Sequence, residues 1–397
     1  MRSFVLCFCS LLVAMTTWIV PSLPHQFTRG ATESWQLIPT PLPPAGTTYF
    51  FSAVAASGPR DAWMVGTQNS ESQGSFLMAK ALIEHWDGRS WKVVPSPETG
   101  SQVSILRSVA VASAHCAIAV GVSYPSRSGS GKAKGLIEQW DGSHWRVRPA
   151  PDAGSFSELN SVSMDAQTHT AWAVGTRGEP NDQRRTALVD AFDGSQWRRI
   201  DVPLPVSRTT LTQVSAFSSQ NVWASGVRDD TAGLLLHFDG RQWSLQQPAM
   251  RYDYLITAVL ASSAQHAWSV GGSQSTSEVH VEHWTGQRWE GLPHPVRVGE
   301  YADYLASVLA FSERDVWVLG AAVAAHTSAP LVQHWDGRSW QVVAVPPPPF
   351  PTQHGGLWAA RIPGQRAFWA LGYTVERSAS LSQLFLALYQ QDLPAGG

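Results

Sequence analysis

One arrangement of apolar and polar positions recurs from about residue 33 to residue 390. Each unit begins with a run of small apolar residues, continues with a segment of the type Ala-Trp-x-Val-Gly, and then enters a variable loop. A third apolar run, such as Leu82–Trp86, is separated by Asp-Gly from a fourth that begins with Trp. Short apolar runs bounded by Gly, Pro and Asp predict β-strands. Each unit is therefore expected to form four antiparallel strands.

The Asp-Gly pair predicts a tight turn between two aromatic residues. Asp-Gly supplies the positive φ that a short β-hairpin turn needs. We expect the turn aspartates to accept backbone hydrogen bonds within their own turns. Close copies of this segment occur six times: His85–Trp91, Gln139–Trp145, Ala191–Trp197, His237–Trp243, His283–Trp289 and His334–Trp340.

The number of units predicts the architecture. The glycine that ends the second strand occurs seven times, at spacings of 45 to 55 residues, and four strands at this period are typical of a β-propeller blade. The last unit, which begins at Leu357, lacks a fourth strand, whereas residues 33–41 match residues 89–97 and have no unit in front of them. We therefore predict an all-β, seven-bladed β-propeller over residues 33–397, closed by an N-terminal strand that completes the last blade. Such closure would remove exposed sheet edges.

Tryptophan supports the same prediction. Of the 19 tryptophans, 17 occupy three recurring positions of the unit. A ring of this size buries about 150 to 250 Å², so we expect these residues to fill the wedges between blades as scaffold. The recurring His85, His237, His283 and His334 are expected to lie on separate blades, away from the axis, and are interpreted as structural rather than as metal ligands.

The repeat resembles a known family. An Asp-x-Trp-x-Val-Gly strand followed by an Asp-Gly-x-Ser-Trp turn is similar to the Asp-box (BNR-type) propeller repeats of sialidases, sortilin-like receptors and photosystem II assembly factors. The turn at 87–91 is one residue shorter than in that family and lacks its leading Ser. The resemblance implies a propeller but no particular activity, because one scaffold hosts many functions. Arg361-Ile362-Pro363 matches part of the sialidase signature, but it lies in the last blade without the preceding aromatic residue, and we interpret it as chance.

The first 24 residues have the layout of an export signal. Arg2 precedes an apolar run from Phe4 to Val20, and Pro21 and Pro24 follow. No clear small-x-small cleavage site follows, and the run is near the lower limit for a membrane span. We predict a signal peptide or an N-terminal membrane anchor over 1–24, with residues 4–20 as the possible membrane tether, and a polar linker over 25–32. The protein is thus expected to be secreted or extracytoplasmic.

Composition excludes several classes of function. Charged residues make up 15% of the chain and the formal net charge is -2, which argues against nucleic acid as a partner. Only Cys116 lies within the repeats, so neither a disulfide framework nor a Cys/His zinc site is expected. No phosphate loop, Ser-His-Asp order or metal-ligand motif is present. We expect no cofactor, no metal site, no catalytic residues of these types, and a monomer.

Candidate function rests on residues that depart from the repeat near the axis, where the first strands and the loops that lead into them meet. An Arg/Tyr/Asp/Trp cluster there would suit a sugar or a carboxylate, although a solvated mouth explains it equally well. The candidate ligand-binding residues are Arg107, Asn160, Arg251, Tyr252, Asp253, Tyr301, Asp303, Trp358 and Arg361.

These residues lead to one preferred function and two alternatives. We predict a binding or scaffolding module for a protein or glycan at the cell surface. This prediction favours an interaction protein over an enzyme. The first alternative is a carbohydrate-active, glycosidase-like enzyme with an axial Arg/Tyr/Asp site. The second is a lectin with sites between blades. A lectin should repeat its ligand contacts blade by blade, whereas an enzyme should concentrate its exceptions at one axial position.

Overall fold

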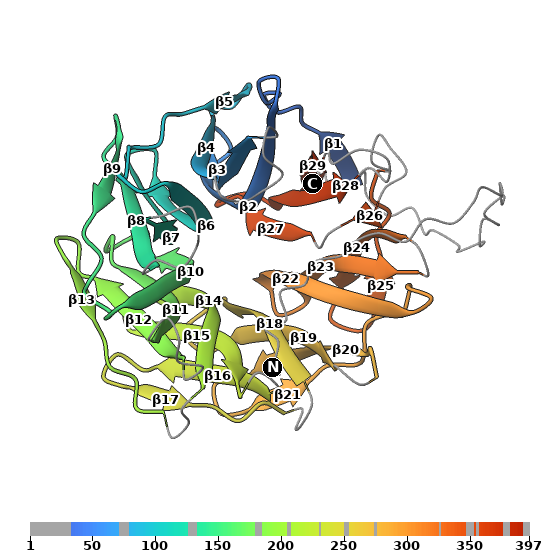
Figure 1. Cartoon of the computed structure of the whole chain (residues 1–397). Coiled ribbons are helices and arrows are strands. Elements are labelled where there is room, and N and C mark those ends of the chain that lie inside the picture. The colour runs from blue at the N-terminus through green and yellow to red at the C-terminus, as the bar shows by residue number, and fades with distance from the viewer. Residues whose placement is uncertain are drawn as a thin grey trace.

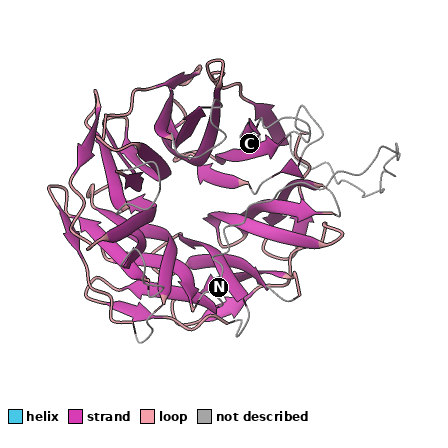
Figure 2. Cartoon of the chain, viewed as in Figure 1, coloured by secondary structure: helices cyan, strands magenta, loops and turns pink. Residues whose placement is uncertain are grey.

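The chain forms a ring of antiparallel sheets around a central axis (Figure 1). The residues that the computed structural model describes form strands and no helices (Figure 2). Within these ranges there is no helix long and apolar enough to cross a membrane. The predicted leader, the predicted linker and the candidate residues Arg251, Tyr252 and Asp253 lie outside the described residues. The described ranges are 33–70, 79–125, 133–178, 185–204, 208–229, 232–249, 254–273, 276–324, 327–346, 353–354, 357–375 and 382–391.

Five blades are separate four-stranded sheets whose strands follow chain order from the axis outward. Blade 1 consists of β2 (Thr47–Gly58), β3 (Asp61–Ser70), β4 (Lys80–Trp86) and β5 (Trp91–Val93). Blade 2 consists of β6 (Val103–Ser113), β7 (Cys116–Tyr124), β8 (Lys134–Trp140) and β9 (Trp145–Arg148). Blade 3 consists of β10 (Phe156–Met164), β11 (Ala171–Gly178), β12 (Thr186–Phe192) and β13 (Trp197–Arg199). Blade 4 consists of β14 (Thr209–Ser218), β15 (Asn221–Arg228), β16 (Ala232–Phe238) and β17 (Trp243–Leu245). Blade 5 consists of β18 (Tyr254–Ala261), β19 (Ala267–Ser273), β20 (Val279–Trp284) and β21 (Trp289–Gly291).

The last two blades contain the closure. Blade 6 consists of β22 (Ala302–Ser312), β23 (Asp315–Val323), β24 (Ser328–Trp335) and β25 (Trp340–Val342). Blade 7 consists of β27 (Trp358–Arg361), β28 (Ala367–Val375), β29 (Ser382–Gln391) and the N-terminal β1 (Glu33–Leu37). The short β26 (Gln353–His354) pairs with both β24 and β28 and so joins the two blades into one nine-stranded sheet.

The predicted closure is confirmed by the pairing of the outermost strand of blade 7. Strand β1 runs antiparallel to β29, with Trp35 opposite Tyr389. The inner strands β2 and β27 are neighbours around the axis (Figure 1). The fold is therefore the predicted all-β, seven-bladed propeller.

Tryptophans fill the wedges between blades, as predicted. Trp63 on β3 is 1% exposed, and its ring lies 4.9 Å from Trp140 and 5.1 Å from Trp145 of blade 2. At the closure, Trp369 of blade 7 lies 5.3 and 5.4 Å from the corresponding pair in blade 1, Trp86 and Trp91. The same packing thus continues across the point where the two ends of the propeller chain meet.

The Asp-Gly turns also have the predicted form. Gly88 has a φ of 91°, and Asp87 Oδ1 accepts the backbone N–H of Arg89 and of Ser90, each at 2.9 Å. A side chain at this φ would be strained. The same pair of hydrogen bonds to an aspartate occurs in four further turns, at Asp141, Asp193, Asp239 and Asp336.

The recurring histidines belong to the scaffold. His85 Nε2 lies 2.8 Å from Asp61 Oδ1, and the His85 ring packs on Trp63 with centroids 4.2 Å apart. His334 repeats this arrangement with Asp315 and Trp317. Each histidine therefore ties the third strand of its blade to the start of the second. Among the described residues, no group of three or more His, Cys, Asp or Glu side chains is arranged to hold a metal ion.

Serine hydroxyls link neighbouring inner strands. Ser108 Oγ accepts the backbone N–H of Val162 at 3.1 Å, and Ser307 Oγ accepts that of Ala359 at 3.3 Å. Ser161 Oγ does the same for Val214 N–H at 3.2 Å. These bonds give partners to N–H groups on the inner edge of a blade, which has no further strand to pair with.

The ring has two distinct faces. We call the face with the first-to-second and third-to-fourth strand turns the hairpin face. The opposite side, where the second-to-third strand loops and the connections between blades lie, is the loop face.

Candidate functional site

Four side chains from blades 2 and 3 meet beside the axis. Arg107 on β6 donates from Nη1 to Glu158 Oε2 at 3.1 Å and also to Asn160 Oδ1. Tyr124, at the end of β7, donates its hydroxyl to Glu158 Oε1 at 2.8 Å. Asn160 in turn donates from Nδ2 to the Leu211 carbonyl of blade 4 at 2.8 Å. We call Arg107, Tyr124, Glu158 and Asn160 the axial cluster.

Backbone irregularity helps to place the axial cluster. The pairing of β6 with β7 shifts register between Leu106 and Ser108, so Arg107 has no partner residue in the ladder. Asn160 occupies the corresponding bulge of β10, between Leu159 and Ser161. Bulges redirect side chains relative to a regular strand. Two successive bulges thus place a guanidinium and an amide within hydrogen-bonding distance across neighbouring blades.

The electrostatics of the axial cluster favour binding over proton transfer. The Glu158 side chain is 12% exposed, and each of its oxygens already accepts a hydrogen bond from Arg107 or Tyr124. Burial, and after it the charge of Glu158, raise the pKa of Tyr124 to about 12. Tyr124 therefore remains a neutral phenol near pH 7. Arg107, whose side chain is 30% exposed, has further N–H donors that a ligand could use.

The structure separates several residues that the sequence grouped. Asp303 is 7% exposed and accepts the backbone N–H of Val298 at 2.9 Å and of Gly299 at 2.7 Å, so it shapes its own loop. Tyr301, beside it, is 57% exposed. Tyr301 and Asp303 lie at the start of blade 6, where Asp303 on β22 is opposite Ala322 on β23. Of the predicted site residues, Arg107 and Asn160 are joined by a side-chain hydrogen bond, and their role in ligand binding stays a prediction.

Two further candidates lie on β27 in blade 7. Trp358 is half-buried and pairs with Leu371. Arg361 ends the strand and lies three to four residues further along the inner strand than the level of Arg107, which is about 10 to 13 Å at 3.3 Å per residue. Arg361 therefore faces a different part of the molecule, the hairpin face.

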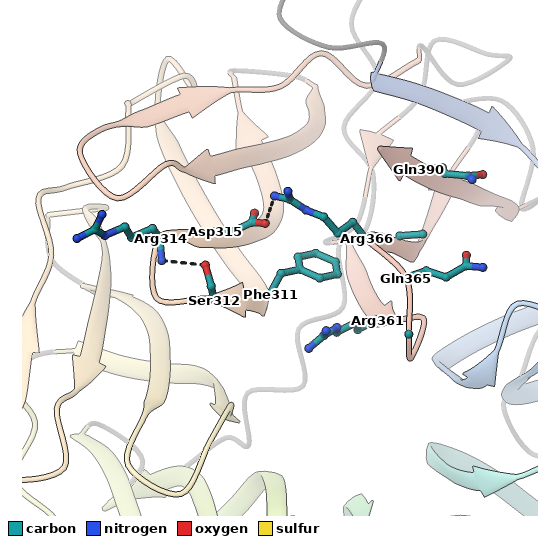
Figure 3. Close-up of a pocket in the computed structure, with 10 residues that line it drawn as sticks. Phe311, Ser312, Arg314, Asp315, Arg361, Gln365, Arg366 and Gln390 are labelled. Atoms are coloured by element: carbon teal, nitrogen blue, oxygen red, sulfur yellow. Dashed lines mark hydrogen bonds and ion pairs between the residues drawn. The ribbon is translucent and has the colours of Figure 1, made fainter. Parts of the chain in front are cut away.

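A pocket lies at that end of Arg361, between blades 6 and 7 (Figure 3). Its volume is about 870 Å³, and it is formed by the first turns of the two blades and by Gln390 on β29. Arg361 lies over the ring of Phe311, with its guanidinium carbon 4.7 Å from the ring centroid. Arg366 donates to Asp315 Oδ2 on the far side of that ring. We call this hollow the hairpin-face pocket.

Sequence reasoning missed Glu158 and Tyr124, although a signal for Glu158 was present. Glu158 directly precedes the buried Leu159, and the corresponding positions of the other described inner strands carry no charge. Those positions are Phe50, Ile105, Thr210, Leu255 and Tyr304. A single charge at an otherwise uncharged position marks a local departure from the repeat.

No family model matches the chain, and no curated protein does. Among solved structures, YCF48 bound to D1 peptide is 13% identical, with 91% of this chain and 95% of that chain covered and a TM-score of 0.56. A polysaccharide lyase of family PL25, an ulvan lyase bound to -[GlcA(1-4)Rha3S]-, is 8% identical, with 86% and 90% covered and a TM-score of 0.55. The fucose-specific lectin from Aleuria aurantia is 12% identical, with 76% and 97% covered and a TM-score of 0.42. Identities this low show the fold alone, and that fold is the β-propeller, here with seven blades.

Proposed function

We propose that the chain is an exported propeller that binds or scaffolds a protein or glycan partner outside the cytoplasm. The observation that carries this proposal is the axial cluster. The repeated polar side chains, such as Asp61, His85 and Asp87, are consumed by bonds within their own blades. Arg107 and its neighbours instead break the repeat together at one position beside the axis. Departures from a scaffold's symmetry are where a specific partner would be recognised.

Three further considerations support this proposal. The YCF48 structure holds a peptide and the lyase structure holds a saccharide, so propellers of similar size accommodate ligands of both kinds. The Trp-x-Val-Gly strand and Asp-Gly turn support assignment to the Asp-box type of repeat, which we propose as the family. The apolar run at residues 4–20 supports export, with the leader either removed or kept as a membrane anchor.

The alternatives have less support. Glycosidases generally use a pair of carboxyl groups that flank the scissile bond. The described part of the axial cluster holds one carboxylate, Glu158, and both of its oxygens are occupied. A lectin with sites between blades should repeat its contacts, whereas the repeated His and Asp side chains here form scaffold bonds. A binding module therefore fits the geometry best.

The test is a binding screen with peptide and glycan arrays, using the protein, Arg107→Ala and Arg148→Ala. Arg148 is the matched control, because it is exposed on the outer strand of the same blade and bonds only to Gln139 Oε1 among the described residues. We expect a ligand whose affinity falls about 10-fold or more in Arg107→Ala, or about 1.4 kcal/mol, and stays unchanged in Arg148→Ala. Binding that survives Arg107→Ala would remove the axial cluster from the proposal. Release of a cleaved glycan would favour the enzyme.

A further inference from the structure

The hairpin-face pocket contains cationic groups that the scaffold does not neutralise. Arg366 is paired with Asp315, which also accepts from His334 at 2.8 Å and from Trp317 Nε1 at 2.9 Å. Asp315 therefore has its partners within the protein. Arg361 and Arg314 form no ion pair with any described carboxylate. The described lining of the pocket thus carries three guanidinium groups and one carboxylate.

Phe311 orients Arg361. The ring packs against the buried cluster between blades 6 and 7, which includes Leu309, Leu357 and Phe368, and Arg361 lies over it. Arg361 Nη1 also donates to the Ala310 carbonyl at 3.3 Å. A guanidinium has five N–H donors in a planar fork, so the others remain available. The protein holds this group in place before any ligand arrives, which reduces the entropy lost on binding.

Arg314 has a different part in the pocket. Its stem packs over the Asp-Gly turn of its own blade, because a Cβ added to Gly337 would lie 2.7 Å from Arg314 Cγ. In Figure 3 its guanidinium points away from Phe311. Arg314 thus contributes positive charge at the rim, whereas Arg361 provides the directed donors.

We propose that the hairpin-face pocket binds a carboxylate of an acidic peptide segment, with Arg361 as its main donor. A volume of about 870 Å³ is within the range of ligand sites. The fork of a guanidinium matches a carboxylate in two parallel hydrogen bonds. The exposed amides of Gln365 and Gln390 can both donate and accept, as a peptide backbone requires.

The packing of the Phe311 ring against the core cluster and Arg361 favours a peptide ligand over an acidic sugar. Sugar sites commonly offer a free aromatic face for stacking, but here the ring rests on the core cluster and carries Arg361. The ring therefore supports the cation and is not a stacking platform. This site is separate from the axial cluster and does not depend on it, because the two lie at different heights on different blades.

The test measures fluorescence polarisation of a labelled hexaglutamate peptide on the full chain at low salt, with hexaglutamine, oligoglucuronate and inorganic phosphate as competitors. We expect Arg361→Gln to weaken hexaglutamate binding about 10-fold or more, and Arg361→Lys to weaken it less, because charge remains but the fork is lost. Arg241→Gln is the matched control, since Arg241 is exposed in the Asp-Gly turn of blade 4 on the same face. It should change binding less than about 2-fold.

A further variant tests the role assigned to Phe311. Phe311→Leu keeps every charge but removes the ring beneath Arg361, and binding should fall by a factor of about 2 to 5, the size of a surface cation–π contact. Three results would overturn the proposal: no hexaglutamate binding, equal losses in Arg361→Gln and Arg241→Gln, or stronger competition by oligoglucuronate or phosphate than by unlabelled hexaglutamate. Thermal unfolding of each variant checks that the fold is intact, and Arg107→Ala should bind hexaglutamate normally.

Discussion

The seam between blades 1 and 2 and the closing seam between blades 7 and 1 share their aromatic packing. They differ in whether the buried carboxylate at the seam has a hydrogen-bond partner. In blade 2, Glu138 is 0% exposed and receives the hydroxyl of Ser96 at 3.0 and 3.1 Å. Ser96 belongs to the segment that follows the outer strand of blade 1. Glu84 has the same place in blade 1 and is also fully buried, but neither of its oxygens has a hydrogen-bond partner. By sequence, the residue of the closing blade that matches Ser96 is Thr40.

A third seam indicates what this position does. In blade 6, Gln333 is buried at the same place and bonds both the N–H and the carbonyl of Val296, in the segment after the outer strand of blade 5. In blades 2 and 6, a buried polar group on the third strand thus holds the segment that follows the outer strand of the preceding blade. At the closing seam the segment that follows the outer strand is the N-terminal segment after β1, and Glu84 forms no hydrogen bond to it. The closure therefore depends on β1 and on aromatic packing, whereas the seams between blades 1 and 2 and between blades 5 and 6 also have a polar tie and a continuous chain.

The largest effect is expected from removing the closing strand. Deletion of residues 33–43 takes away β1 and with it Trp35, whose ring lies 5.1 Å from Tyr389 and 5.7 Å from Phe368. The outer edge of β29 would be exposed, and we expect the protein to lose its single cooperative thermal transition. Calorimetry measures this. The control is Leu42→Ala, because Leu42 is 89% exposed and should change stability by less than about 0.5 kcal/mol. A deletion variant that melts like the full chain would contradict the closure.

The next effect compares the aromatic wedges. Trp91 at the closing seam is 3% exposed and Trp145 at the ordinary seam is 4% exposed. Each should cost about 3 to 5 kcal/mol when replaced by Ala, because a large cavity forms. Denaturant unfolding of the two variants gives both values. If they differ by more than about 1 kcal/mol, the seams are not equivalent in packing and the polar tie is not the main difference.

The third effect is a pH dependence that belongs to Glu84. Burial raises the pKa of Glu84 to about 8, well above the value of an unfolded chain. The folded protein therefore holds the proton, so this contribution to stability is complete below the unfolded pKa and is lost as pH rises through about 8. We expect Glu84→Gln to be more stable than the parent by about 4 to 5 kcal/mol near pH 9 and close to it near pH 4. Unfolding free energies at both pH values measure it, and parallel pH profiles would refute it.

The smallest effect tests the polar tie directly. Ser96→Ala removes the donor from buried Glu138 and should cost about 1 to 3 kcal/mol. Thr40→Ala at the matching position should cost less than about 0.5 kcal/mol, because Glu84 has no hydrogen-bond partner to lose. Equal losses in the two variants, measured by thermal unfolding at one pH, would mean that Thr40 does hold Glu84 in solution.

Much of the fold was predictable because the same sequence pattern recurs in every blade. The period of the Gly residues gives the blade, the Asp-Gly pair gives the turn, and the unmatched strand around Trp35 gives the closure. Trp63 and Trp91 were predictable as wedges because their spacing recurs. Each of these inferences uses an average over blades, so a single exceptional residue hardly affects it.

The site was less predictable for the opposite reason. Arg107 and Arg361 both depart from the repeat on inner strands, but their heights along the axis depend on a bulge and on the strand's end, which no spacing reveals. The partner of Arg107, Glu158, comes from another blade. The bare carboxylate of Glu84 depends on the path of the segment after β1. Such contacts arise between segments far apart in sequence, and a local pattern contains no information about them.

The serine bonds along the inner strands also limit how this surface can change during evolution. Ser108, Ser161 and Ser307 occupy N–H groups that an added strand would otherwise pair with. A partner peptide at these positions would therefore be bound through side-chain contacts and not through main-chain hydrogen bonds to an inner strand. If the axial cluster binds a partner as proposed, a new partner could be acquired by exchanging a few inner-strand side chains, such as Arg107 or Asn160, while the turns and wedges that maintain the ring stay the same.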